Sequence, residues 1–236
     1  LTWENYFQRK FSVYACKYQN GKWSESVQLT PENQVCFDPA LAEGKDRKLY
    51  LAYGTTDGFH QNIEMRIFDS NSLKLIKQVP VAIGGGLENR VNLNTKPALA
   101  FDKINRLWIS WENNRNTCRL EDGDNYTGDR CCSMVCYSDG KVMEPVKTGK
   151  WLFDGKNDQL PTFVKDKNQN LYAFTRCGGD FAESFSWKFR VSRLLQDGWT
   201  RPEIILTTKQ KGQTSVPSVI FDDDNKFWLV WRMEQL

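Results

Sequence analysis

The stretch PALAFDKINRLWISW, from Pro97 to Trp111, decides the fold. Two short runs of apolar and aromatic residues flank a polar reversal that extends from Asp102 to Arg106. Runs of this length and composition favour β-strands, and the Asp, Lys and Asn between them suit a tight turn. A proline fits the opening of a strand, where no ladder donor is needed. The stretch therefore predicts a strand, a turn and a second strand.

The same pattern occurs four times, which makes it an internal repeat. Each copy begins at a proline: Pro39, Pro97, Pro161 and Pro217. The apolar residue that opens the second run stands ten positions later in every copy, as Leu49, Leu107, Leu171 and Phe227. An aspartate stands five positions after the proline in three copies, as Asp102, Asp166 and Asp222, and Gly44 takes that place in the first.

Two further strands are expected after each of the first three copies. They are predicted at 65–68 and 73–76, at 133–137 and 142–146, and at 189–191 and 203–206. No segment of ten residues or more shows a helical period, so no long helix is expected. Repeated four-stranded antiparallel units build β-propellers. The predicted fold is all-β, a β-propeller of four-stranded antiparallel blades; the rival, a β-sandwich, would not require the repeat.

The whole chain, 1–236, is predicted to be one propeller domain or a segment of one. Predicted blades cover 31–80, 81–148 and 149–208, and a fourth would combine 1–30 with 209–236. Residues 1–5 resemble residues 109–113, the end of a second strand, which the C-terminal copy already supplies. This duplication favours a piece of a longer ring, of six or seven blades, over a closed ring of four.

Composition excludes several classes of function. The formal net charge is only +3, which is too small to indicate a nucleic-acid partner. No apolar run approaches the roughly 18 residues of a membrane span, so no membrane insertion is expected. The single histidine, His60, excludes any site built from two or more histidines.

The cysteines favour an oxidising compartment. The chain has seven, and four are clustered, as Cys118, Cys131, Cys132 and Cys136. Such a cluster in a loop-rich chain suggests disulfides and a secreted, periplasmic or cell-surface location. Reduced, buried thiols are the alternative, and zinc is a weaker one because no pair shows the C-x-x-C spacing.

Glycines in three expected hairpins carry a resemblance to a known class of repeat. These hairpins read Asn20-Gly21-Lys22-Trp23, Ser138-Asp139-Gly140 and Gln196-Asp197-Gly198-Trp199. Their place and their glycine resemble the Asp-box, S-x-D-x-G-x-x-W, of the sialidase-like (BNR-like) propeller repeats of secreted proteins. The full motif does not occur, and the family's arginine triad, Tyr–Glu pair and acid Asp do not map onto this sequence. The resemblance implies the fold and a secreted setting, and it transfers no catalytic residue.

The loops that follow the second strands are the expected ligand site, because loops on one face of a propeller surround its channel. Charged residues begin these loops, as Glu4, Glu112, Arg176 and Arg232, and aromatic residues precede several of them, including Trp111 and Trp231. Aromatic faces stack on sugars and hold cations, and arginine forks bind carboxylates. The competing interpretation is that the charges pair with one another and hold the blades together.

Two weaker hypotheses concern catalysis and metal binding. Glu112 and Asp158, which enters the same face, form a possible acid–base pair for a glycosidic bond. Asp122, Asp124 and Asp129 lie in the longest insertion, where their oxygens are candidate Ca²⁺ ligands, although the EF-hand spacing is absent. No cofactor is otherwise expected.

The leading prediction is therefore a binding module for a carbohydrate or protein ligand. The alternative is a glycan-active enzyme, either a sialidase-like glycoside hydrolase or a polysaccharide lyase, and a third interpretation is a structural scaffold. The binding module leads because no complete set of catalytic residues can be assembled from the sequence.

Overall fold

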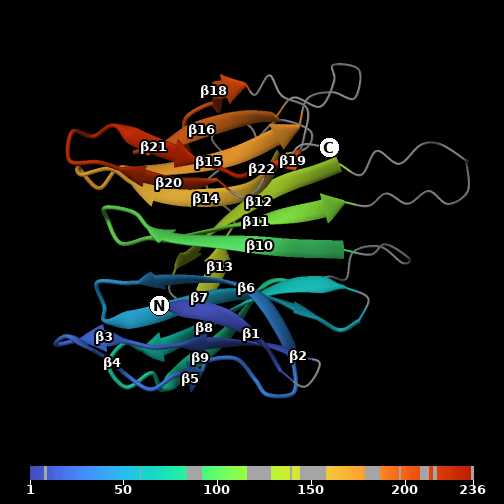
Figure 1. Cartoon of the computed structure of the whole chain (residues 1–236), viewed down its shortest axis with the longest axis vertical. Coiled ribbons are helices and arrows are strands. Elements are labelled where there is room, and N and C mark those ends of the chain that lie inside the picture. The colour runs from blue at the N-terminus through green and yellow to red at the C-terminus, as the bar shows by residue number, and fades with distance from the viewer. Residues whose placement is uncertain are drawn as a thin grey trace, which may run out of the picture.

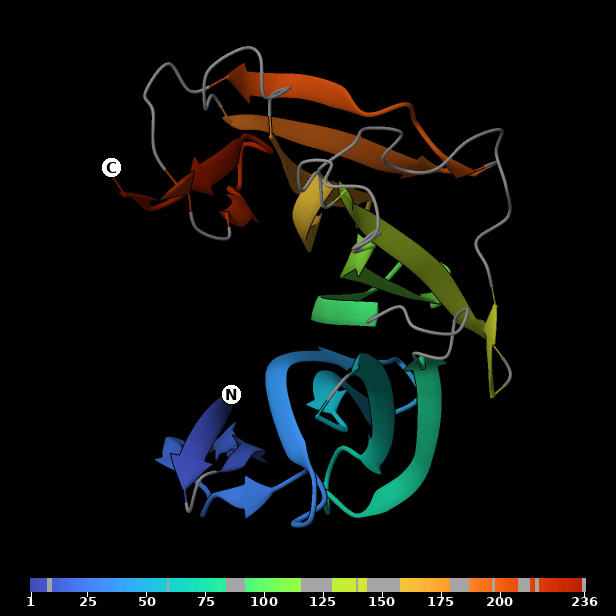
Figure 2. The ribbon, with the colours of Figure 1, turned by 90° about the vertical axis from the view of Figure 1, so that its right-hand side faces the viewer.

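The computed structural model confirms that the chain is all-β. It describes residues 1–7, 10–58, 60–83, 92–115, 129–138, 140–143, 158–178, 187–196, 198–207, 213–214 and 217–234, and these contain strands and turns but no helix. Residues 35–82, 92–143 and 158–207 follow one another along the long axis (Figure 1), and the first and last sheets lie beside the two ends of this series. In the view at right angles their course is curved, and the two termini lie on the same side (Figure 2).

The first sheet has three strands in the order β1-β2-β5, with a small hairpin, β3–β4, between β2 and β5. The strand bounds are Thr2–Phe7 for β1, Lys10–Ala15 for β2, Tyr18–Gln19 for β3, Lys22–Trp23 for β4 and Val27–Gln28 for β5.

Two four-stranded meanders follow the first sheet. One contains β6 (Val35–Glu43), β7 (Lys48–Thr56), β8 (Gln61–Asp69) and β9 (Leu75–Ala82); the next contains β10 (Asn92–Phe101), β11 (Leu107–Arg115), β12 (Asp129–Ser138) and β13 (Lys141–Met143). All neighbours within each meander are antiparallel, as predicted. A parallel pairing of Leu93 with Gln61 joins the two into one eight-stranded sheet.

A third meander and a final hairpin complete the described structure. The meander contains β14 (Asp158–Lys165), β15 (Leu171–Gly178), β16 (Trp187–Leu195) and β18 (Glu203–Thr207), with β17 (Gly198–Trp199) paired to the end of β16. The hairpin is β20 (Ser218–Phe221) with β21 (Phe227–Val230), and β19 (Gln213–Thr214) pairs with β22 (Met233–Glu234). The first sheet and the final hairpin are thus separate sheets, while the predicted blade boundaries and the number of blades stay predictions.

The prediction that a proline opens each first strand is wrong for the first three copies, because these strands begin before it. Each strand has a β-bulge just ahead of its proline, where the pairing register shifts. The residue before the proline has a positive φ, of 50° at Asp38, 53° at Lys96 and 54° at Leu160. A bulge leaves a residue outside the ladder, so the missing N–H of proline is tolerated inside the strand.

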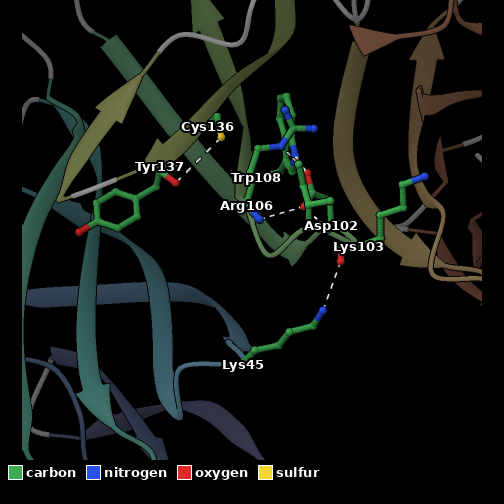
Figure 3. A network of polar contacts seen from close by, with 8 residues as sticks. Lys45, Asp102, Lys103, Arg106, Trp108, Cys136 and Tyr137 are labelled. Carbon is green, nitrogen blue, oxygen red and sulfur yellow. Dashed lines mark hydrogen bonds and ion pairs between the residues drawn. The ribbon is translucent and has the colours of Figure 1, made fainter. Parts of the chain in front are cut away.

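The repeated aspartate explains the turn between the first two strands. Asp102 Oδ1 accepts hydrogen bonds from the backbone N–H groups of Ile104, at 3.1 Å, and Arg106, at 2.8 Å. Its Oδ2 accepts a hydrogen bond from the Trp108 indole at 3.0 Å (Figure 3). Asp222 binds the corresponding amide and indole, of Lys226 and Trp228, at 2.8 and 2.9 Å. One carboxylate therefore satisfies the turn and orients the following aromatic side chain.

Neighbouring turns are also linked. The Lys45 ammonium donates to the carbonyl oxygen of Lys103 at 3.2 Å (Figure 3), and the Lys45 N–H donates to Asn105 Oδ1 at 3.1 Å. Lys167 repeats both bonds with Asp223 and Asn225, at 3.2 and 3.3 Å. These side chains connect the turn of one repeat to the turn of the next repeat.

The core lies between successive sheets. We call the face of each sheet that contacts the next sheet its forward face, and the opposite face its rear face. Tyr50 and Ala52 on the forward face of β7 share a buried cluster with Leu107 and Ile109 on the rear face of β11. Each interior sheet thus buries both faces, which explains the high aromatic content.

Candidate functional site

The predicted charged residues lie at the same end of successive second strands. Glu4 is in β1, Glu112 in β11 and Arg176 in β15, while Arg232 follows β21. In the first strands, Thr95 pairs with Glu112 and Gln159 pairs with Arg176, directly ahead of the bulges. The bulges therefore bring irregular backbone next to these side chains.

Glu112 connects two meanders. Its side chain is 95% buried, since only 5% of the residue's surface is exposed. Glu112 Oε2 accepts a hydrogen bond from the N–H of Leu160 in the next meander, at 3.3 Å. Glu4 makes the same kind of bond from the first sheet, where its Oε2 accepts from the N–H of Asp38 at 2.9 Å. Both carboxylates satisfy the amide of a bulge residue, so they help to hold neighbouring sheets together.

Gly54 holds this position in the first meander, and the structure compensates for the missing carboxylate. A Cβ atom on Gly54 would overlap Cε2 of Phe37, so the Phe37 ring occupies that space. The bulge amide of Lys96 instead donates to Asp38 Oδ2 at 3.3 Å, and the Lys96 ammonium pairs with Asp38 Oδ1 at 2.7 Å. At three successive junctions, from the first sheet to the third meander, a carboxylate therefore accepts a hydrogen bond from the amide of a bulge residue.

Asp158 is completely buried and is paired with a residue that the sequence analysis did not identify. Its two oxygens lie 3.1 and 3.0 Å from Nη1 of Arg190 in β16. The Thr175 hydroxyl in β15 donates to Oδ1 at 3.4 Å. A guanidinium this close compensates the charge of a carboxylate that has lost its water. In the sequence Arg190 alternates with Phe189 and Val191 as a solvent-facing residue would, so nothing there indicates that it is buried beside Asp158.

Arg176 is also buried, with 7% of its surface exposed. It donates from Nη2 to Gln159 Oε1 across the β14–β15 pair. Its guanidinium carbon lies 3.9 Å from the centre of the Trp187 ring, so the arginine stacks on an aromatic face. Neither Gln159 nor Trp187 was a candidate from the sequence.

The structure places the remaining predicted ligand residues in different surroundings. Trp111 is buried in the core and donates to Asn94 Oδ1 at 3.0 Å. Trp231 is half-buried and its ring centre lies 5.3 Å from that of Phe189. Arg232 is exposed. Trp111 thus packs between sheets, whereas Arg232 faces solvent.

The metal and disulfide hypotheses fall mainly outside the described residues. Asp122, Asp124 and Cys118 lie outside them altogether, and the side chains of Asp129, Cys131 and Cys132 do as well. Within the described part of the chain, no group of three or more His, Cys, Asp or Glu could hold a metal. In the same part, no helix is long and apolar enough to cross a bilayer.

Four cysteines in the described ranges form no disulfide: Cys16, Cys36, Cys136 and Cys177. Burial raises the pKa of the Cys36 thiol to about 11. Burial also raises the pKa of Cys177, and the negative charge of Asp158 adds to this rise. These two thiols stay protonated near neutral pH and are poor nucleophiles.

The candidate site is therefore the buried polar cluster at the junction of the second and third meanders. Its members all lie on β11, β14, β15 or β16, and all are at least nine-tenths buried: Glu112, Asp158, Gln159, Thr175, Arg176 and Arg190. We call it the carboxylate cluster. It combines two carboxylates with two guanidinium groups, which gives it both acid–base groups and fixed positive charge.

No protein-family model and no curated protein matches this sequence. Solved structures do match its fold. A Penicillium chrysogenum α-L-arabinanase complexed with arabinobiose has a TM-score of 0.61 and 17% identity, over 95% of this chain and 68% of that one. A Fusarium graminearum GH93 α-L-arabinofuranosidase complexed with arabinobiose has a TM-score of 0.57 and 19% identity, over 94% and 67%. A thermostable family-43 glycoside hydrolase has a TM-score of 0.54 and 13% identity, over 87% and 66%.

These structures are β-propellers, so the likeness supports the predicted fold class. The chain spans about two thirds of the length of each. The sialidase-like character of the repeats is not confirmed. The leading prediction of a pure binding module is contradicted, because many of the solved structures that share the fold, including these three, are glycoside hydrolases and favour the glycan-active alternative.

Proposed function

We propose that this chain forms part of a glycoside hydrolase. The observation that carries the proposal is the meeting of Glu112 and Asp158 at one junction of a propeller whose fold is found in solved glycoside hydrolases. Glu112 is bonded to the amide of Leu160, two residues along β14 from Asp158. Hydrolysis of a glycosidic bond ordinarily needs two carboxyl groups on rigid elements, and this junction supplies them.

The two carboxyl groups have different surroundings, which suits different roles. Asp158 is held by Arg190, whose positive charge stabilises the carboxylate form. It is therefore suited to stabilise positive charge that develops on a sugar ring in the transition state. Glu112 accepts a hydrogen bond from the backbone N–H of Leu160, which fixes its carboxyl group at the junction, and we assign it the role of proton transfer.

Arg176 is suited to position a substrate. Gln159 and the face of Trp187 fix its guanidinium, so little side-chain entropy remains to be lost when the arginine binds a sugar. Every glycan carries hydroxyl groups, to which a guanidinium donates hydrogen bonds, while a side-chain amide both donates to them and accepts from them. We therefore expect Arg176 and Gln159 to orient the sugar relative to Glu112.

Arabinose-containing glycans are the first substrates to test, because an α-L-arabinofuranosidase and an α-L-arabinanase with this fold are complexed with arabinobiose. The test incubates the chain with arabinan, arabinobiose and 4-nitrophenyl α-L-arabinofuranoside, and a sialoside is added because of the Asp-box-like hairpins. Mass spectrometry then measures retention and cleavage separately. Cleavage of any of these glycans supports the proposal. If the chain retains glycans but cleaves none of them, the proposal is contradicted.

We also propose a secreted, periplasmic or cell-surface location. The support is indirect: polymeric glycans are met outside the cell, and the clustered cysteines suit an oxidising compartment. Fractionation of the producing cells tests this, since recovery of the protein only from the cytosol would contradict it.

A further inference from the structure

A lysine links the turn of one repeat to the turn of the next at two junctions of the chain. Lys45 and Lys167 each stand six positions after the proline of their repeat. Each donates its ammonium to the carbonyl oxygen at the same position of the next repeat, at 3.2 Å. Each also donates its backbone N–H to an asparagine side chain two residues further on, Asn105 or Asn225. We call this pair of hydrogen bonds the lysine bridge.

The lysine bridge is absent between the second and third meanders, although the lysine is present. Lys103 holds the bridging position there, and Gln169 stands where the other repeats have Asn105 and Asn225. Among the described residues, no hydrogen bond joins Lys103 to the turn that contains Gln169. The three turns have the same backbone form, with φ of 66° at Asn105, 61° at Gln169 and 64° at Asn225. The longer glutamine side chain therefore distinguishes this turn from the other two.

A cavity of about 270 Å³ lies where the bridge is missing, and we call it the turn cavity. Lys103 and Gln169 both line it, together with residues of the turns at 102–106 and 169–171 and of the hairpin at 194–196. In Figure 3 the Lys103 side chain extends toward the strands of the third meander. The volume is close to the lower end, about 300 Å³, of the range for small-molecule pockets. The turn cavity therefore has room for a small organic molecule.

The walls of the turn cavity are largely apolar. Leu171 is buried, whereas Ile104 and Leu195 line the cavity while 63% and 48% exposed. An exposed apolar side chain gains free energy when a ligand covers it. Ile104 is also unusual among the repeats, because the other three turns have a polar residue at its position: Asp46, Asn168 and Asp224. The apolar character is thus particular to the turn that borders the cavity.

The charged groups of the turn cavity favour an anion. Its lining includes the cations Lys103 and Arg106 and one acidic residue, Asp102. Arg106 Nε pairs with Asp102 Oδ2 at 2.6 Å, so these two charges compensate each other. Both oxygens of Asp102 are also engaged by the amides of its own turn and by the Trp108 indole. Among the lining residues, the exposed ammonium of Lys103 therefore remains as an uncompensated charge.

We propose that the turn cavity binds a small carboxylate with an apolar or aromatic body. The carboxylate pairs with Lys103 and accepts a hydrogen bond from the Gln169 amide, so the ligand connects the two turns where the lysine bridge does not. The body of the ligand covers Ile104 and Leu195. A single negative charge matches the single uncompensated ammonium. The cavity lies at the opposite end of the strands from Glu112, and the inference is independent of the proposed catalytic activity.

The test measures binding of 4-(trifluoromethyl)benzoate to the whole chain by fluorine NMR at low ionic strength. The wild type is expected to bind this probe with a Kd of about 1 mM or below, as its size allows. The neutral analogue 4-(trifluoromethyl)benzamide should bind about tenfold more weakly, because it cannot pair with an ammonium. Added NaCl should weaken binding of the carboxylate by screening the same charge. Absence of saturable binding would overturn the proposal, and equal affinity for both probes would indicate a neutral occupant and overturn it too.

Two variants and a matched control locate the binding. Lys103→Met removes the ammonium from an exposed side chain and should raise the Kd about tenfold. Lys167→Met removes the lysine at the same repeat position; this lysine is bound to the carbonyl oxygen of Asp223 and does not line the cavity, so its loss should leave the Kd unchanged. Leu195→Asp places a negative charge at the cavity and should abolish binding.

Circular dichroism verifies that each variant is folded before binding is measured. Lys103 and Leu195 are both exposed, so neither substitution disturbs the core. A Kd that is unchanged in Lys103→Met or in Leu195→Asp would overturn the proposal. An equal loss of affinity in Lys103→Met and Lys167→Met would overturn it as well, because it would show attraction to the general charge of the surface.

Discussion

Glu112 Oε2 lies 3.3 Å from the backbone nitrogen of Leu160, and this bond crosses from one four-stranded meander to the next. The positive φ of Leu160, 54°, belongs to the bulge that precedes Pro161. A bulge amide is outside the strand ladder and needs another acceptor. The carboxylate that we propose for catalysis is therefore also positioned by the repeat itself.

The buried Asp158–Arg190 pair is expected to be important for stability. Arg190→Met would leave the Asp158 carboxylate buried without this partner, which typically costs about 3–5 kcal/mol. Urea denaturation followed by Trp fluorescence measures the free energy of unfolding. The double variant Asp158→Asn/Arg190→Met should recover part of the loss, because it removes both charges. Equal stability of Arg190→Met and the wild type would show that the pair does not hold these strands.

A side chain at position 54 is expected to destabilise the protein while Phe37 is present. In Gly54→Ala the new Cβ would overlap the Phe37 ring, so the ring must move, at a cost of about 1–3 kcal/mol. In a Phe37→Ala background the same substitution should cost much less, because the clash is absent. Thermal unfolding of the two single variants and the double variant measures this coupling. Additive losses would contradict the assigned contact.

Asp166, the aspartate of the turn between β14 and β15, is expected to make the stability of the protein depend on pH in the acidic range. Burial alone would raise the pKa of Asp166, but hydrogen bonds from Asn170 and Asn168 outweigh it and hold the pKa below the ordinary value of 3.8. A depressed pKa stabilises the folded state fully above the ordinary value, and this contribution is lost as the pH falls through the lower folded pKa.

Asp166→Asn should therefore be less stable than the wild type at neutral pH, by about 1–2 kcal/mol. The difference between the two proteins should shrink as the pH falls below 3.8, where the unfolded wild type takes up the proton, and should vanish below the lower pKa of the folded carboxylate. Denaturant titrations at several pH values measure this. A difference that is constant with pH would mean that the charge of Asp166 contributes nothing.

Trp187 is expected to act on substrate binding through Arg176. Trp187→Ala removes the ring under the guanidinium, 3.9 Å away, and frees a side chain that we propose to orient the sugar. A cation–π contact of about 1–2 kcal/mol corresponds to a rise of about tenfold in KM, with kcat little changed. Trp187→Phe keeps an aromatic face and should restore most of the affinity. A fall in kcat alone would place Trp187 outside substrate binding.

The repeat made most of the fold predictable from the sequence. The aspartates at 102, 166 and 222 share a spacing because each accepts backbone hydrogen bonds within its own turn, which is a local interaction. The bulges were missed because Pro39, Pro97 and Pro161 were interpreted as strand openings. A proline in a strand interior is compatible with the ladder only at such an irregularity, and the sequence shows the proline but not the register shift.

The candidate site was predictable only in part. Glu112, Asp158 and Arg176 were recognised because they occupy equivalent or adjacent repeat positions. Arg190 and Trp187 belong to a third strand, and their contacts with Asp158 and Arg176 depend on the pairing of β15 with β16. Whether each charged residue serves structure or catalysis also depends on burial, which the sequence does not specify. Glu4 and Glu112 show this, since both bind bulge amides but only Glu112 is buried.

The pair Glu4 and Glu112 provides the most direct test of the proposed hydrolase. Both accept a hydrogen bond from a bulge amide, at 2.9 and 3.3 Å, so Glu4→Gln and Glu112→Gln make the same structural change at two junctions. The measurement is kcat/KM of the two variants and the wild type on the glycan that the wild type cleaves. We predict that Glu112→Gln lowers it by about 100-fold or more, as expected for the loss of a proton-transfer group, and that Glu4→Gln leaves it nearly unchanged. Equal activity of the two variants would contradict a catalytic role for Glu112 and leave it as a structural link between the sheets.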